Sequence, residues 1–323
     1  MPWRDGAHPW AFVLAVGLAL LVDIALGEPP AAWHPVVWMG RYLEAAGRRF
    51  APARETPRGR PDVRAFARGT FYWCAGAALT LVLAAVLQAV LLAAPAWLAV
   101  AGLALLLKPM LAWAMLRREV QAVELALADS LPAGRERLSR LCSRDVSGLS
   151  AEQVRETAIE SLAENLNDSV VAPVFWFVLL GLPGAAVYRY ANTADAMWGY
   201  LGMRGGRDWT WAGKWAARAD DALSWLPARI TAALLALAAG GMPARRLRRE
   251  AGRTPSPNSG WPMAAMALAL GVHLRKPGVY VLNQDGADPQ HADTARAIRL
   301  AGRCVLALPV LAALAAWPGG MAA

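Results

Sequence analysis

Acidic residues recur every four positions in one polar stretch of this sequence. They are Glu156, Glu160, Glu164 and Asp168. The stretch begins with Ser150 ahead of Gln153, the residue pair of a capping box, so we predict a helix over residues 151–168. A spacing of four places the acids on one side of that helix, where like charges repel. Such a row needs a counter-charge, a metal ion or open water; the plainest alternative is a solvated helix face.

Amide oxygens accompany these carboxylates. Asn165 and Asn167 lie beside Glu164 and Asp168, just before the apolar run that starts at Val170. Carboxylate and amide oxygens are the ligands of hard cations such as Mg²⁺. The sequence therefore suggests a metal site at a membrane boundary.

A second polar group combines amide, hydroxyl and carboxylate side chains between aromatic residues. It contains Asn192, Thr193 and Asp195. These residues are suited to hold a polar ligand, and the alternative is a capped turn at the membrane interface. Lys214, Asp220 and Asp221 follow.

Basic and acidic residues occur close together at Lys214, Arg218, Asp220 and Asp221. Such a combination is suited to hold phosphate together with its metal. Neutralised pairs at a helix start are the alternative. The chain contains neither a G-x-x-x-x-G-K-S/T loop nor a G-x-G-x-x-G after a strand, so any nucleotide must bind in another way.

The elements that position these residues belong to a membrane protein. Of 323 residues, 57% are hydrophobic and only 18% are charged, which a soluble domain does not tolerate. The net charge of +9 comes mostly from arginines that flank apolar runs, which is typical of cytoplasmic loops and argues against nucleic-acid binding. No linker or repeat divides the chain, so we predict one domain over residues 1–323.

About four apolar runs are long enough to span a bilayer. They lie near residues 10–26, 71–93, 96–116 and 300–317. A signal peptide is the disfavoured alternative for the first run, because no small-residue cleavage site follows it. Asp23 lies near the end of the first run, and Lys108 lies inside the third, where it either has a function or snorkels to the interface.

Two further runs, residues 170–187 and 226–241, contain or begin with proline, so we predict that they are broken. Either they span, or they are re-entrant or buried against protein, as broken helices require. The arginine-rich loop over residues 28–69, which includes Arg58, places the loop and the helical portion 117–169 in the cytoplasm.

Histidines and cysteines are scattered. His8, His34, His273 and His291 share no metal-binding spacing, and Cys74, Cys142 and Cys304 form no C-x-x-C pair. We therefore expect no zinc site and three buried thiols in a reduced compartment.

Several blocks together resemble the CobD/CbiB family, the membrane-bound adenosylcobinamide-phosphate synthases of cobalamin biosynthesis. The blocks, in family order, are Glu28-Pro29-Pro30 with His34-Pro35 and Met39-Gly40-Arg41; Glu160 to Asn165 with Asp168; Asn192-Thr193 with Asp195 and Gly199-Tyr200; Arg218 with Asp220-Asp221 and Pro227-Ala228-Arg229; and Pro257-Asn258 with Gly260-Trp261. The sequence departs from the family pattern at Ser169, Ala196 and Arg275-Lys276.

The resemblance implies an all-α, polytopic membrane ligase at the cell inner membrane, with an active site that faces the cytoplasm. Its reaction joins aminopropanol or aminopropanol phosphate to a propionate of adenosylcobyric acid, using ATP and Mg²⁺. Possible partners are a second copy of the chain and later membrane enzymes of cobalamin assembly.

Roles for individual residues follow as hypotheses from the resemblance and the residue types. The catalytic candidates are Glu160, Glu164, Asp168 and Asp195. The metal candidates are Glu160, Glu164, Asn165, Asp168, Asp220 and Asp221. The substrate-binding candidates are His34, Arg41, Asn192, Thr193, Lys214, Arg229 and Asn258. Two other classes stay open: a non-catalytic membrane sensor such as the distant relative AmpE, and a transporter, although no inverted repeat is evident.

Overall fold

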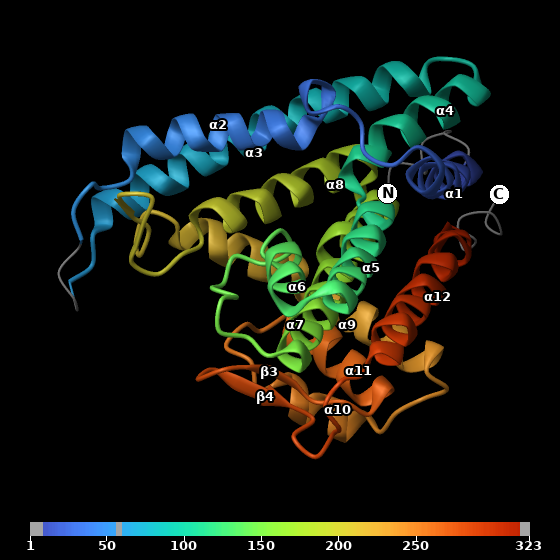
Figure 1. Ribbon diagram of the computed structural model, residues 1–323. Coiled ribbons are helices and arrows are strands. Elements are labelled where there is room, and N and C mark those ends of the chain that lie inside the picture. Colours follow the sequence, from blue (N-terminus) through green and yellow to red (C-terminus); the bar gives the residue numbers. More distant parts are fainter. Residues whose placement is uncertain (1–8, 56–59, 317–323) are drawn as a thin grey trace. The chain divides into compact units, whose positions relative to one another are not determined.

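A computed structural model describes residues 9–55 and 60–316 of the chain (Figure 1). Nearly all regular structure in this part is helical, and the strands form only two short antiparallel hairpins. The all-α prediction is therefore confirmed. His8, Arg58 and the final residue of the predicted run 300–317 lie outside the described residues.

The chain divides into two compact units, each assembled from separated segments. The first contains the chain up to Leu111, Pro173–Leu223 and the segment from Ala312 onward. The second contains Ala112–Ala172 and Ser224–Leu311. The single domain over residues 1–323 stays a prediction.

The first unit is built around apolar helices. Its elements are α1 (Pro9–Leu26), the 3-10 turn η1 (Ala31–Trp33), α2 (Pro35–Phe50), α3 (Val63–Leu92), α4 (Ala96–Leu107), the 3-10 turn η2 (Lys108–Met110), most of α8 (Ala172–Trp198), β1 (Met203–Arg204), β2 (Arg207–Asp208) and the start of α9 (Lys214–Ala238). Helix α1 contacts α4, and α2 contacts α3. An aromatic cluster that includes Phe50, Trp198 and Trp209 packs in the hydrophobic core of this unit.

The second unit holds the polar helices. Its elements are α5 (Trp113–Asp129), α6 (Leu131–Leu138), α7 (Ala151–Leu166), the π-helical turn η3 (Asn167–Val171), the rest of α9, α10 (Ala244–Ala251), α11 (Gly260–Leu270), β3 (Leu274–Lys276), β4 (Tyr280–Leu282) and most of α12 (His291–Ala316). Helix α7 is central, because α5, α6, α11 and β3 all contact it. Its capping box is present as predicted: the Ser150 hydroxyl accepts from the Gln153 N–H, and the Ser150 N–H donates to the Gln153 side chain.

Five helical segments are long and apolar enough to cross a membrane, which supports a multi-pass membrane protein. They are Val63–Leu92, Ala96–Asp129, Ala151–Trp198, Lys214–Ala238 and His291–Ala316. Helix α1 is one of the shorter apolar helices. The predicted helix over 96–116 needs one correction: α4 ends at Leu107, and a 3-10 turn carries Pro109, because proline has no N–H to continue the α-helical ladder.

The break predicted in residues 170–187 is present and lies at Gly181. This residue has φ 73° and ψ −160°, a conformation that only glycine adopts readily. The Gln88 side chain of α3 accepts a hydrogen bond of 2.7 Å from the freed Leu182 N–H. The break thus leaves no unsatisfied donor at Leu182 in an apolar environment.

The second predicted break, in residues 226–241, is wrong. Helix α9 continues from Lys214 through Pro227 to Ala238. Proline at this position removes the N–H that would bond to the Leu223 carbonyl. The Trp176 indole donates to that carbonyl instead, at 3.1 Å. Length and composition allow both runs to span, so their re-entrant placement stays a prediction.

Candidate functional site

The acidic row of α7 is not a solvated face. Glu156 and Glu160 are only 0% and 2% exposed, whereas Glu164 and Asp168 are half-buried. Burying ionised carboxylates is costly unless each is paired and hydrogen-bonded. The alternative of open water is therefore wrong for the first two acids, and their partners decide what the row can do.

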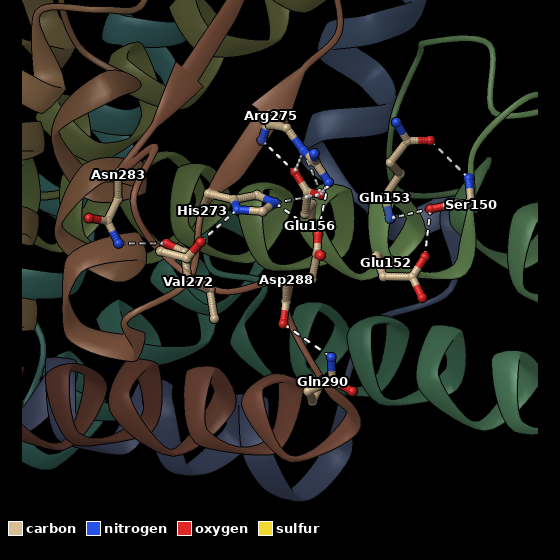
Figure 2. Close-up of polar contacts among 11 residues, drawn as sticks. Ser150, Glu152, Gln153, Glu156, Val272, His273, Arg275, Asn283, Asp288 and Gln290 are labelled. Atoms are coloured by element: carbon tan, nitrogen blue, oxygen red, sulfur yellow. Dashed lines mark hydrogen bonds and ion pairs between the residues drawn. The ribbon is translucent and has the colours of Figure 1, made fainter.

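Glu156 is neutralised by an arginine from the β3 strand (Figure 2). The Arg275 backbone N–H donates to Glu156 Oε2 at 2.7 Å, and its guanidinium donates to Glu156 Oε1 at 2.6 Å. The same guanidinium reaches Asp288 Oδ1 at 3.0 Å. The hydrogen bonds to Glu156 raise the pKa of Arg275 above its usual value. This pair fastens the β3–β4 hairpin to α7.

Glu160 has two partners. The Arg144 guanidinium and the Tyr280 hydroxyl both donate to its carboxylate. Burial lowers the pKa of Arg144, but the charge and the hydrogen bond of Glu160, together with the nearby Tyr280 and Cys142, raise it above its usual value overall. Burial and the Glu160 charge raise the pKa of Tyr280 far above its usual value, so the phenol remains a donor. The predicted counter-charge is confirmed for Glu160, which pairs with Arg144.

Glu164 differs from both. Among the described residues, Glu164 forms no ion pair. Four charged groups are still close enough to act on its carboxyl electrostatically: the acids Glu160 and Asp168 and the cations Lys276 and Arg144. Two carboxylates with a neighbouring amide form an oxygen-rich donor set, as Mg²⁺ requires. The residues therefore fit a hard cation at Glu164 and Asp168, with Asn165 nearby.

A π-helical turn follows at this point of the helix. Asn167 donates to Asp168 Oδ1 at 2.7 Å, and Thr231 of α9 donates to Asn167 Oδ1 at 3.1 Å. The turn spans Asn167–Val171. A π-turn inserts an extra residue, so the Asp168 side chain points in a different direction from the one that a regular α-helix would give it. Such turns often occur at functional sites. Asn165 donates to the Ser161 carbonyl at 2.9 Å, which fixes its side chain on α7.

A second feature of the same unit is a cavity of about 660 Å³ at the start of α11. Arg229 lines this cavity and donates to Asn258 Oδ1 at 2.8 Å and to the Pro257 carbonyl at 3.0 Å. Its guanidinium also lies over the rings of Trp225 and Trp261, at 4.4 and 4.8 Å from their centres. The volume lies in the range of small-molecule sites. The structure thus brings the predicted residues Arg229 and Asn258 together.

The first unit holds another part of the predicted set. Arg189 donates to Asn192 Oδ1, and Asn192 donates to Asp220 Oδ1, each at 3.4 Å. Thr193 donates to the carbonyl four residues earlier at 2.7 Å. These residues lie within α8, so the alternative of a capped turn is wrong.

Other predicted residues of this unit lie nearby in sequence. Asp195 is half-buried on α8, while Asp220 and Asp221 lie on α9. The Lys214 ammonium lies 3.8 Å from the centre of the Trp211 ring. The negative face of the ring attracts the ammonium and helps to hold the Lys214 side chain in place.

The loop after α1 forms a charged cluster. Lys108 Nζ lies 2.8 Å from Glu28 Oε2 and 3.3 Å from Asp23 Oδ1, and His34 Nε2 lies 3.1 Å from Glu28. Burial alone would raise the pKa of Glu28, but the bonds to His34 and Lys108 lower it. Lys108 is therefore paired, and the snorkelling alternative is wrong.

His34 also caps α2, since its Nδ1 accepts from the Val36 N–H at 3.3 Å. Its Nε2 consequently carries the proton that is donated to Glu28. Arg41, seven residues after His34, is exposed on α2. The structure thus ties His34 to the loop and leaves Arg41 on the surface.

The predicted site residues divide between the two units. The first unit contains His34, Arg41, Asn192, Thr193, Asp195, Lys214, Asp220 and Asp221. The second contains Glu160, Glu164, Asn165, Asp168, Arg229 and Asn258. Sequence reasoning missed Arg144, Arg275 and Tyr280 as partners of the acidic row. Only the unusual Arg275-Lys276 pair was a signal, and it did not reveal its partner.

Comparison with known proteins gives consistent matches. The family model described as CobD/Cbib protein matches residues 16–303. The chain is 41% identical over 286 residues to the probable cobalamin biosynthesis protein CobD of Methanothermobacter thermautotrophicus, covering 84% of this chain and 87% of that protein. It is 41% identical over 302 residues to the cobalamin biosynthesis protein CobD of Chromobacterium violaceum, covering 90% and 92%. No solved structure matches.

Proposed function

Because the chain belongs to the CobD/CbiB family, we propose that it acts in cobalamin biosynthesis as an ATP-dependent ligase. The bond formed is an amide between a propionate of adenosylcobyric acid and aminopropanol or aminopropanol phosphate, which gives adenosylcobinamide or its phosphate. The observation that carries this proposal is the acidic row of α7, in which two carboxylates are neutralised and Glu164 forms no ion pair among the described residues.

The chemistry requires an activated carboxylate. The propionate oxygen attacks the terminal phosphorus of ATP and ADP leaves; the amine nitrogen then attacks the acyl carbon and phosphate leaves. Mg²⁺, when bound, would neutralise phosphate charge. Glu164 and Asp168 would hold it, and Asp168 is already oriented by Asn167. A carboxylate of this row takes the proton that the substrate ammonium must lose before its nitrogen can attack, and Asp195 of the first unit is the other candidate for this base.

Binding roles follow from the remaining contacts. Arg229 presents a guanidinium held by Asn258 and two tryptophan rings, an arrangement suited to a phosphate or a corrin amide. In the first unit, Asn192, Thr193 and Lys214 are assigned to phosphate or amide groups, with Asp220 and Asp221 as further metal ligands. His34 and Arg41, also of the first unit, are assigned to substrate binding.

The decisive test is conversion by the purified protein. We expect adenosylcobyric acid to be converted to an amide product only when ATP, Mg²⁺ and the amine are all present. Running aminopropanol and its phosphate in parallel identifies the true amine. Product formation would exclude both a sensor and a transporter. Retention of the corrinoid without any turnover would contradict a ligase and favour the AmpE-like sensor class.

Topology gives an independent prediction. Since ATP is available inside the cell, the segment around Asn192 should face the cytoplasm, at the inner membrane. In a background without Cys74, Cys142 and Cys304, Asn192→Cys should resist a membrane-impermeant thiol reagent in intact cells and react after lysis. Ala196→Cys, at an exposed position of the same helix, is the matched control for accessibility. Labelling of both variants in intact cells would show that this segment faces outward instead.

A further inference from the structure

Three side chains around Glu156 gather donor atoms that the proposed ligation does not use. Glu156 comes from α7, His273 immediately precedes β3, and Asp288 lies in the loop before α12 (Figure 2). One ligand atom of each lies within 4.8 Å of the other two. All three belong to the second unit.

The protonation of His273 makes this cluster unusual. Its Nδ1 lies 2.9 Å from the Gly286 carbonyl, which can only accept, so Nδ1 carries the proton. In a neutral ring, Nε2 then presents a lone pair. This buried atom has no hydrogen-bond partner within the described part of the chain, and it faces Asp288 Oδ1 at 3.0 Å and Glu156 Oε1 at 3.6 Å. Two carboxylates this close to Nε2 call for a shared cation, which is either a proton on Nε2 or a metal ion bound by all three groups.

We propose that Glu156, His273 and Asp288 form a binding site for a divalent metal ion of the zinc class. Tetrahedral bonds of about 2.0–2.1 Å separate neighbouring ligand atoms by about 3.3 Å, and the two His273 distances lie on either side of that value. The bond from Nδ1 to a backbone carbonyl is the usual support of a metal-bound histidine. Imidazole with carboxylates suits Zn²⁺, whereas Mg²⁺ prefers oxygen alone.

Arg275 is the competitor for this site. Its guanidinium contacts the same two oxygens, Glu156 Oε1 at 2.6 Å and Asp288 Oδ1 at 3.0 Å. The two carboxylates and one arginine leave a net charge of −1, so a divalent ion is still favoured electrostatically. Arginine and metal must share or exchange these oxygens. Removing Arg275 should therefore strengthen metal binding, a result opposite to that of removing a ligand.

The three donors are far apart along the chain, which is why the sequence alone indicated no zinc site. His273 is far along the chain from Glu156, and no short motif joins the three donors. Only the hairpin that brings β3 to α7 creates the cluster.

The test uses the full chain in detergent, stripped with a chelator and titrated with Co²⁺. We expect one Co²⁺ per chain, with the intense visible absorption of a four-coordinate site, and displacement by Zn²⁺ but not by excess Mg²⁺. His273→Ala and Asp288→Asn should weaken binding at least about tenfold. The Asp288 side chain is 53% exposed, so this variant should fold even if the first does not. Arg275→Ala should tighten binding.

Matched controls exclude accidental binding. Asp285→Asn removes an exposed carboxylate of the same loop, and His291→Ala removes an exposed histidine that pairs with Glu124, so both should bind Co²⁺ as the wild type does. Absence of stoichiometric Co²⁺, or equal affinity of wild type and Asp288→Asn, would overturn the proposal and leave a proton as the cation at Nε2. Neither ATP nor corrinoid is present, so the result is independent of the ligase assay.

Discussion

Replacing Glu164 with glutamine should lower the rate of amide formation by about 10²–10⁴-fold. Glutamine keeps the shape of the side chain but removes its charge and its ability to take a proton. Glu156 and Glu160 are already held by Arg275 and Arg144, so neither is free to substitute for it. The measurement is turnover of adenosylcobyric acid at saturating ATP and amine.

The matched control is Glu152→Gln. Glu152 lies on the same helix, in its first turn, and accepts from the Ser150 hydroxyl at 2.7 Å, which an amide oxygen can also do. This variant should turn over as the wild type does. Thermal unfolding of both variants separates a catalytic defect from misfolding. Wild-type turnover in Glu164→Gln would remove Glu164 from the mechanism.

Replacing Lys108 with methionine should destabilise the protein by about 3–5 kcal/mol, because it takes away the cation of a buried ion cluster. The Asp23 side chain is 0% exposed and the Lys108 side chain only 5%. Methionine fills a similar volume, so the loss reports mainly on charge. The measurement is the free energy of unfolding in detergent, followed by tryptophan fluorescence.

Two further variants make this interpretation specific. Arg48→Met breaks an exposed i,i+4 pair with Glu44 and should cost less than about 1 kcal/mol. The double variant Asp23→Asn with Lys108→Met should recover part of the loss, since the neutral amide no longer needs the cation. A single Lys108→Met variant as stable as Arg48→Met would mean that the cluster contributes little to stability.

The sequence predicted the parts of the fold that depend on local pattern. The capping box at Ser150, the helix that follows it and the apolar runs of α3 and α12 all follow from residue spacing and hydropathy within short windows. The break at Gly181 was also predictable, because glycine and proline interrupt that run. The continuous path of α9 through Pro227 was not, since it depends on the Trp176 indole, 47 residues away from the carbonyl it bonds.

The same division applies to the candidate site. The regular spacing identified Glu160 and Glu164, but not that one is neutralised and the other forms no ion pair. Tyr280 lies 120 residues from Glu160, and no local window relates two such positions. Likewise, Lys108 and Glu28 each attracted attention, yet their pairing joins residues 80 apart. Long-range partners decide which acidic residues keep a chemical role.

The fastening of the β3–β4 hairpin to α7 has a consequence for biosynthesis of the chain. Glu156 emerges from the ribosome 119 residues before Arg275, so this acid is made well ahead of the arginine that neutralises it. Until the hairpin arrives, Glu156 is either hydrated or protonated, which opposes its early burial. The polar unit can therefore mature only late in translation, after most apolar helices have been synthesised. A chain that stops before residue 275 should expose this acidic helix to quality control.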